Sequence, residues 1–281
     1  MVLLELFAAQ ATARGYELTV AHFDHGMRAE SAADAAFVAA AAARLGLPFA
    51  SQAAGLGAAS EAAARAARHG WLEQVRVAAG AAATLTGHHQ DDLLETSLLN
   101  LARGTGRLGL APMPPSSTIG RPLRATTRAQ LRAYAATHRV AWREDSTNAD
   151  LTNPRNLLRH RLLPSAPPAW QPAYLALMVE LSALNTKIDQ SISDILNATR
   201  RGAQTYSFPD PLLQTLTLPE LEELILAAAR ALHPGIELGR PLIMSAAKFA
   251  VTGRPRKQHP LRRGLMLYRE KGRTDLTNQP V

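Results

Sequence analysis

Imidazoles and carboxylates are concentrated in one stretch, Thr86 to Gly104, with the sequence TGHHQDDLLETSLLNLARG. A Gly-His-His turn precedes Asp91 and Asp92, which would lie in the first turn of a helix. Asp92, Glu95 and Thr96 have i, i+3 and i+4 spacing and would share one face of that helix. A short apolar strand (83–86) precedes the turn, and ligands of open α/β sheets bind where a strand passes into a helix. The stretch therefore predicts a binding or catalytic site at the start of this helix.

The same residues have simpler explanations. Acidic residues in a first helical turn complement the helix dipole without any other role, and Gly87 could be an ordinary turn glycine. Leu94, Leu98 and Leu101 would anchor another face of the helix in a core. His88, His89, Asp91 and Asp92 could also form a dinuclear metal site of a phosphoesterase, although no further Asp-rich or His-rich segment supplies the remaining ligands.

Arginine is unevenly distributed along the 281 residues, whose net charge is +8. Residues 1–102 carry 6 arginines against 10 acids, whereas residues 103–161 carry 11 arginines against 3 acids. An acidic site followed by a dense arginine segment favours a polyanionic partner such as nucleic acid, because arginine contacts phosphates with two nitrogens. These arginines could equally be a solvated surface. Nine basic residues against one acid between Lys248 and Arg273 form a second candidate nucleic-acid surface, or a flexible basic end.

The chain contains no cysteine, which excludes disulfides, thiolate metal sites and thiol nucleophiles. Residues 1–14 are apolar but interrupted by Glu5, without a basic leader or a cleavage site. No stretch resembles a signal peptide or a membrane span, so we expect a cytoplasmic protein.

Strands and helices alternate in the first half of the chain. We expect helices at 2–14, 31–45, 60–79 and from Asp91, and strands at 18–22, 48–52 and 83–86. This order predicts an α/β fold with a doubly wound parallel sheet. A strand should precede residue 2, so we expect Met1 to be an internal methionine.

The second half has a different pattern. Asn153 caps a helix that Pro154 starts, and the Pro-rich residues 165–172 predict a linker. A long amphipathic helix follows from Tyr174 to about Thr199. We therefore expect a catalytic domain at 1–164, the linker at 165–172, and a smaller, mainly helical region with a basic end at 173–281.

Four stretches form a characteristic set: AHFDHGMRAESAADAAFV (21–38), TGHHQDDLLETSLLNLARGTGRLGL (86–110), IGRPL (119–123) and WREDSTNADLTNPRNLLRHRLLP (142–164). Together they resemble the tRNA(Ile)-lysidine synthase family of PP-loop (N-type) ATP pyrophosphatases, whose fold is adenine-nucleotide alpha-hydrolase-like. The resemblance covers much of 1–164 and is loose beyond it.

The resemblance implies a ligase that forms a carbon–nitrogen bond. It would activate the C2 carbonyl of the wobble cytidine in tRNA-Ile with a CAU anticodon by adenylation, which releases pyrophosphate, and L-lysine would then attack C2 and displace AMP; ATP and Mg²⁺ are implied. Asp91, Asp92 and Glu95 would bind lysine, one of these carboxylates or His88 would accept a proton, and Asp91 or Asp92 could hold Mg²⁺. The residues expected to border the nucleotide are Ala21, His22, Gly87 and Arg103. The residues expected to contact RNA are Arg107, Arg121, Arg155, Asn156 and Arg159.

The family's phosphate-binding motif, SGGxDS, would fall just upstream of Met1 and is not in the sequence. A chain without it would bind ATP poorly, because backbone N–H groups of such loops hold the pyrophosphate. A non-catalytic tRNA-binding remnant of the family therefore stays open as an alternative, beside the phosphoesterase. The absence of cysteine disfavours tRNA thiolation, which in this superfamily generally uses cysteine chemistry. The oligomeric state is open, with a homodimer as one option.

Overall fold

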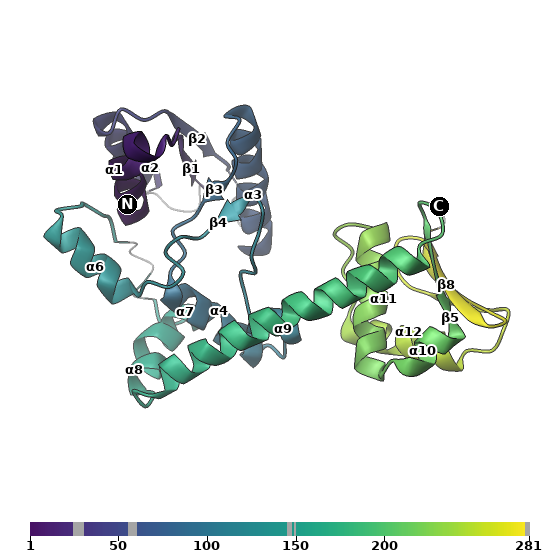
Figure 1. The fold of residues 1–281 in the computed structure, drawn as a ribbon. Coiled ribbons are helices and arrows are strands. Elements are labelled where there is room, and N and C mark those ends of the chain that lie inside the picture. The colour runs from purple at the N-terminus through teal and green to yellow at the C-terminus, as the bar shows by residue number, and fades with distance from the viewer. Residues whose placement is uncertain (25–30, 56–60, 145–147, 149, 279–281) are drawn as a thin grey trace. The chain divides into compact units, whose positions relative to one another are not determined.

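The computed structural model describes residues 1–24, 31–55, 61–144, 148 and 150–278 (Figure 1). The chain divides into two compact units, Met1–Ser182 and Ala183–Val281. This division falls inside one long helix, α9 (Trp170–Thr199). The helix begins at Trp170, within the segment 165–172 that the sequence predicted as a linker, and it continues without interruption past Ser182.

The first unit has the α/β fold predicted from the alternation of strands and helices. Strands β1 (Val20–Asp24) and β2 (Phe49–Ala53) pair in parallel, and β3 (Thr84–Leu85) pairs in parallel with β4 (Ile119–Gly120). No ladder joins the two pairs in the residues that the structure describes. Helices α2 (Ser31–Arg44) and α3 (Glu61–Ala78) both contact β1, and α1 (Val2–Arg14) precedes it. Three of the four strands were predicted, with bounds shifted by one or two residues.

Short helices complete the first unit. They are α4 (Gln90–Ala102), α5 (Arg107–Leu110), α6 (Arg128–Thr137), α7 (Pro154–Leu157), a π-helical turn (Leu158–Leu162) and α8 (Leu163–Ser165). The predicted cap of α7 is confirmed, because Asn153 Oδ1 accepts a hydrogen bond of 2.9 Å from the backbone N–H of Arg155. Thr127 and Gln130 form a capping box at α6, in which each side chain accepts from the other's backbone N–H.

The core face of α4 differs from the predicted one. Leu94 is fully buried as expected, but Leu101 is 51% exposed. Leu93 packs with Met113 and Met178, and the remaining buried positions of the helix are the polar Glu95 and Ser97. The Ser97 hydroxyl donates to the carbonyl of Leu110 at 2.6 Å and lies 2.9 Å from the Tyr174 hydroxyl. The sequence analysis expected leucines alone to anchor this helix, whereas hydrogen bonds of Ser97 also hold it in place.

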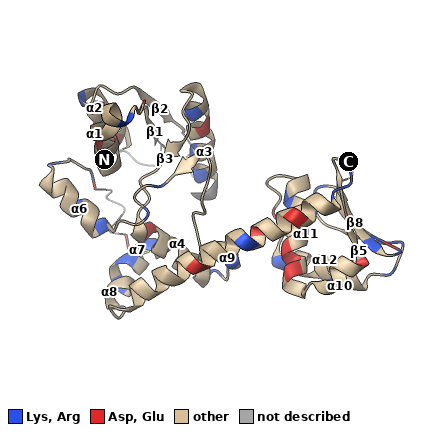
Figure 2. Ribbon diagram, viewed as in Figure 1, with Lys and Arg blue, Asp and Glu red and all other residues tan. Residues whose placement is uncertain are grey.

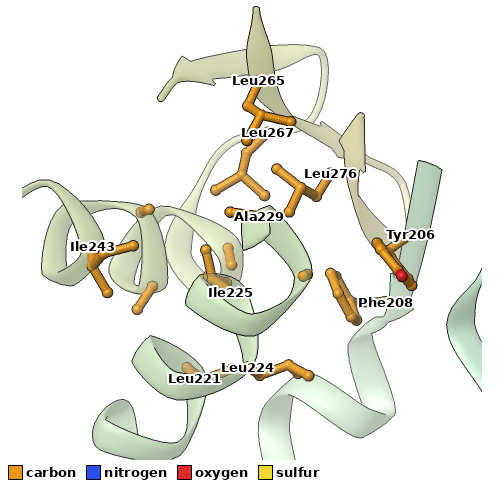
Figure 3. Close-up of a cluster of buried hydrophobic side chains, with 14 of the residues drawn as sticks. Tyr206, Phe208, Leu221, Leu224, Ile225, Ala229, Ile243, Leu265, Leu267 and Leu276 are labelled. Carbon is orange, nitrogen blue, oxygen red and sulfur yellow. The ribbon is translucent and has the colours of Figure 1, made fainter. Parts of the chain in front are cut away.

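The second unit contains an antiparallel sheet that the sequence analysis did not predict. Its strand order is β5-β8-β7-β6, from Thr205–Pro209, Arg273–Asn278, Leu265–Glu270 and Lys257–Pro260. Helices α10 (Asp210–Thr215), α11 (Leu218–Leu232) and α12 (Arg240–Thr252) complete the unit. Much of the stretch considered as a flexible basic end thus forms strands. Figure 3 shows Phe208, Leu224 and Leu276 among the side chains of the core between helices and sheet.

No helix within the described ranges combines the length and the hydropathy that a membrane span requires.

Candidate functional site

The turn between β3 and α4 places two neighbouring aspartates at the start of a helix. Asp92 Oδ2 accepts a hydrogen bond of 3.0 Å from the backbone N–H of His89, which closes the first turn of α4. Asp91 points elsewhere, because its Oδ2 accepts a hydrogen bond of 2.8 Å from the backbone N–H of Arg128, the first residue of α6. Asp91 therefore joins the start of α4 to the start of α6, in addition to complementing the helix dipole.

Asp92 borders two cavities of the first unit. The first cavity, of about 460 Å³, is lined by Asp92 together with Arg128, Arg132 and Arg159. The second cavity, of about 500 Å³, is lined by Asp92, by His88 and by apolar side chains of α1 and α3. Gly87 borders both cavities, whereas Asp91 and Glu95 line neither. One carboxylate at the tip of α4 is thus accessible from two sides.

Glu95 is the centre of an arginine cluster, which we define as Arg128, Arg155 and Arg159. Arg159 donates Nε to Oε1 and Nη2 to Oε2, both at 2.8 Å, and Arg128 donates Nη2 to Oε1 at 3.1 Å. Arg155 Nε lies 3.1 Å from Oε2 as an ion pair, while its Nη2 donates to the Thr96 hydroxyl at 2.8 Å. Figure 2 shows the acidic residues of α4 and the basic residues of α7. One carboxylate faces three guanidinium groups, which leaves two positive charges in excess.

This geometry argues against the predicted lysine-binding role of Glu95. Its side chain is only 1% exposed, and both oxygens are in contact with arginines. Burial alone would raise the pKa of Glu95, but the hydrogen bond from Arg159 and the charges of the three arginines bring that pKa below its ordinary value. Glu95 is therefore an ionised carboxylate that positions arginines, and an amino acid would have to displace them to reach it.

His88 lies in a basic and partly buried environment. Its Nδ1 lies 2.9 Å from the Thr86 hydroxyl. Burial, followed by the charges of Arg121, Arg68 and Arg65, lowers the pKa of His88 to about 4, although Asp92 acts in the opposite direction. The imidazole is consequently neutral at pH 7, and it is a weaker base than the sequence analysis expected.

The sequence analysis did not assign a function to the arginines of α3. We define the Arg68 cluster as Arg65 and Arg68 of α3 with Arg121 and Arg124 after β4. Burial first, and a neighbouring arginine second, lowers the pKa of both Arg68 and Arg121. Their Nε atoms are buried and have no hydrogen-bond partner among the described residues. The i, i+3 spacing of Arg65 and Arg68 could have indicated from the sequence that these two arginines share a helix face. Their nearness to Arg121 depends on tertiary structure and could not.

The predicted nucleotide residues fall in different places. Ala21 lines the second cavity, Gly87 lines both, and His22 lines a third cavity of about 280 Å³. Arg103 follows the opposite end of α4, about 18 Å from Asp91 at the helical rise per residue. The structure thus does not bring Arg103 to the tip of α4.

The predicted RNA contacts are also divided. Arg155 and Arg159 belong to the arginine cluster and Arg121 to the Arg68 cluster, whereas Arg107 is part of α5. Asn156 is only 5% exposed and donates Nδ2 to the carbonyl of Asp150 at 2.9 Å. This internal bond fits a structural role for Asn156 and not the RNA contact that was predicted.

The phosphoesterase hypothesis required a metal site built from His88, His89, Asp91 and Asp92. In the ranges that the structure describes, no group of three or more His, Asp or Glu side chains is arranged to hold a metal ion. His89 lies 3.6 Å from Asp91 Oδ2 and 3.5 Å from Asp92 Oδ2, but with a different ring nitrogen toward each aspartate, and His88 faces Thr86 instead. Asp92 alone remains compatible with Mg²⁺, which takes one or two carboxylates when phosphates supply other ligands.

Comparisons with known proteins concern the first part of the chain. The family model of the PP-loop domain matches residues 1–166. The tRNA(Ile)-lysidine synthase of Solibacter usitatus is 41% identical over 163 residues, which cover 57% of this chain and 37% of that protein. The tRNA(Ile)-lysidine synthases of Thermus thermophilus and Gloeobacter violaceus are 44% and 40% identical, over 53% and 58% of this chain. The matched regions span 31% and 52% of those two proteins.

A solved structure resembles the fold at low sequence identity. The U34-tRNA thiolase NcsA from Methanococcus maripaludis, determined with its [4Fe-4S] cluster, has a TM-score of 0.52 and 13% identity. The match covers 65% of this chain and 67% of the thiolase. At this identity the likeness supports the α/β fold only.

Proposed function

Because the chain belongs to the PP-loop domain family, we propose that it acts as a tRNA(Ile)-lysidine synthase. The reaction would join L-lysine to C2 of the wobble cytidine of tRNA-Ile with a CAU anticodon, through an adenylated intermediate formed from ATP. The named relatives support this activity. The match covers only part of their length, so substrate, cofactor and partner are all proposals for this chain.

The position of Asp92 carries the proposal. Its carboxylate lies between a cavity lined in part by arginines and a cavity at the amino end of β1 and the carboxyl end of β3. A carboxylate binds an ammonium group by short, charge-assisted hydrogen bonds, and the carboxyl end of a strand, here β3, is where ligands of open α/β sheets bind. A cationic amino acid at Asp92 would thus reach nucleotide on one side and RNA on the other.

The two arginine groups have separate proposed roles. In the second cavity, Arg68 offers a buried Nε–H without a partner in the described part of the chain, and this guanidinium fits a phosphate of ATP. ATP, when bound, would supply the adenylyl group that activates the cytidine carbonyl. In the first cavity, the excess charge of the arginine cluster would attract RNA phosphates or stabilise developing negative charge.

The attacking amine must lose a proton. His88, with a pKa of about 4, is poorly matched to that step. Of the candidate bases, we therefore favour Asp92, which lines both cavities. Mg²⁺ bound mainly by phosphate oxygens could share this carboxylate.

We also propose the domain roles that the sequence predicted. Residues 1–164 would form the catalytic domain, and residues 173–281 would handle the RNA substrate.

The direct test is incorporation of labelled L-lysine into tRNA-Ile with a CAU anticodon, with and without ATP. Asp92→Asn keeps an acceptor for the His89 N–H but removes the charge, so we expect lysine incorporation to fall by about 10- to 100-fold, as the loss of a charged hydrogen bond implies. Asp91→Asn is the matched control, because asparagine still accepts from the Arg128 backbone, and it should retain most activity.

Each part of the proposal has its own contradicting result. Binding of tRNA without any ATP-dependent lysine incorporation would overturn the proposed reaction and leave an RNA-binding protein. Full activity of Asp92→Asn would overturn the proposed role of Asp92 while leaving the reaction in place.

A further inference from the structure

Trp142 is an exposed aromatic side chain on the wall of the first cavity. Its exposed fraction is 47%, and it also lines the third cavity. Burial of a tryptophan side chain stabilises a protein strongly. This residue nevertheless keeps nearly half of its surface exposed at the candidate site.

A hydrogen-bond chain at the surface supplies a partner for the polar edge of the ring. Trp142 Nε1 donates to Glu144 Oε1 at 3.1 Å, and Arg132 Nη2 donates to the same oxygen at 2.8 Å. Because the indole N–H already has an acceptor, a ligand that stacks on the ring leaves no new polar group unsatisfied.

The other two tryptophans already have aromatic neighbours. Trp71 lies 5.6 Å from Phe23 between ring centroids, and Trp170 stacks on Tyr174 at 5.0 Å with an interplanar angle of 15°. Within the part of the chain that the structure describes, no aromatic ring stacks on Trp142. Trp142 is thus the tryptophan with a free face beside a cavity.

The charges around Trp142 restrict the kind of ligand. Arg128, Arg132 and Arg159 line the same cavity, together with His160 and the two acids Asp92 and Glu144, so the arginines outnumber the carboxylates. Aromatic faces combined with arginines are the usual means of binding unpaired bases and the adjoining phosphates of RNA. The cavity volume of about 460 Å³ lies in the range of small-ligand sites.

We propose that Trp142 is a stacking platform for an unpaired base of the RNA substrate, with neighbouring phosphates directed to Arg132 and Arg159. This inference rests on the proposed function, which supplies an RNA with an unpaired anticodon loop. The adenine of ATP is the competing aromatic ligand. The second cavity, which is lined by Arg68 and by the turn after β3, is the better place for ATP.

Tryptophan fluorescence gives a readout that does not depend on activity. In the full chain carrying Trp71→Phe and Trp170→Phe, Trp142 is the only remaining tryptophan. We expect a stem-loop RNA with the CAU anticodon to quench its emission in a saturable manner. We expect a fully paired duplex of the same length, or ATP alone, to leave it nearly unchanged.

Affinity measurements on the chain with its other tryptophans intact provide a second, independent arm. Removing a stacked base contact should weaken stem-loop binding by about tenfold in Trp142→Ala, whereas Trp142→Phe should stay within about threefold. Tyr16→Ala is the matched control, because Tyr16 is similarly exposed at 44% and lines none of the three cavities.

The outcomes separate this inference from the proposed function. RNA binding without quenching, together with unchanged affinity of Trp142→Ala, would overturn the stacking role even if lysine incorporation is intact. Quenching by ATP alone would assign the platform to the nucleotide and also overturn it. If the unaltered chain binds no RNA, the proposed function fails together with the inference. If the variant carrying Trp71→Phe and Trp170→Phe does not fold, the affinities of Trp142→Ala and Trp142→Phe for the stem-loop test the stacking role by themselves.

Discussion

Glu95 and Arg159, 64 residues apart in the sequence, form a two-point ion pair in which Nε and Nη2 of the arginine each lie 2.8 Å from a carboxylate oxygen. The carboxylate is buried, whereas the arginine lines the first cavity. This pair connects the interior of α4 to the surface that we assign to RNA. It follows that Glu95 controls the placement of positive charge at the site.

The first prediction concerns Glu95→Gln, which keeps the shape of the side chain and removes its charge. Breaking a buried ion pair from one side costs about 3–5 kcal/mol. Because the arginines retain 17–35% exposure and can reach water, we expect the lower end, about 3 kcal/mol, measured by urea unfolding. Glu144→Gln is the control, since Glu144 and its partner Arg132 are 58% and 59% exposed and should contribute less than about 1 kcal/mol.

A particular result would restore the role that the sequence predicted for Glu95. If Glu95→Gln has normal stability and raises only the KM for lysine, Glu95 is a direct ligand. A simultaneous loss of stability and of tRNA affinity agrees instead with its contact to the arginine cluster.

The second prediction concerns Asp91→Ala, which removes the acceptor for the N–H of Arg128 at the start of α6. Loss of a capping interaction costs about 1 kcal/mol, and we expect that decrease in unfolding free energy. The KM for lysine should stay close to that of the unaltered chain. A selective tenfold rise of this KM at unchanged stability would place Asp91 in the lysine site.

Local signals in the sequence predicted local structure well. The helix predicted at 2–14 is α1, which ends at Gly15 in the left-handed conformation with φ of 66°, and the helix start predicted at Asn153 and Pro154 is that of α7. These features depend on neighbouring residues only. The two aspartates of α4 were likewise placed correctly in its first turn.

Contacts between distant residues were beyond the reach of the sequence. Glu95 was read as a free ligand because its partners, such as Arg128 and Arg159, are 33 and 64 residues away. In the second unit, the basic composition of 248–273 concealed an alternating strand, in which Leu265, Leu267 and Arg269 are buried. Average charge carries no information about this alternation, and the basic residue of the strand, Arg269, is itself buried.

The third prediction is a pH dependence of stability that arises from His88. Its pKa falls from the ordinary 6.5 to about 4 in the folded protein, so the unfolded chain takes up a proton more readily. The folded state is therefore not penalised above pH 6.5, and stability is lost as pH falls from about 6.5 to about 4. We expect the Tm of His88→Gln to fall less than the Tm of the unaltered chain between about pH 6.5 and about pH 4.

Comparing the two proteins removes the contributions of groups that they share. His69, whose pKa is also lowered by burial and by nearby arginines, is present in both. Parallel Tm curves for the two proteins between pH 7 and pH 4 would show that His88 titrates normally.

The fourth prediction concerns the second unit, where Arg269 is 9% exposed and forms a two-point ion pair with Asp210. Asp210→Ala leaves the guanidinium buried with weaker acceptors, the carbonyl of Gly253 and the Thr274 hydroxyl, so we expect a loss of about 3 kcal/mol in urea unfolding. Adding Arg269→Met removes the uncompensated charge and should recover part of that loss, since replacing both partners of a buried pair is milder than removing one. Asp194→Ala is the control, because Asp194 is exposed and accepts only from Gln190 one turn away among the described contacts. A double variant that is less stable than Asp210→Ala would mean that Arg269 stabilises the sheet by packing and not through its ion pair.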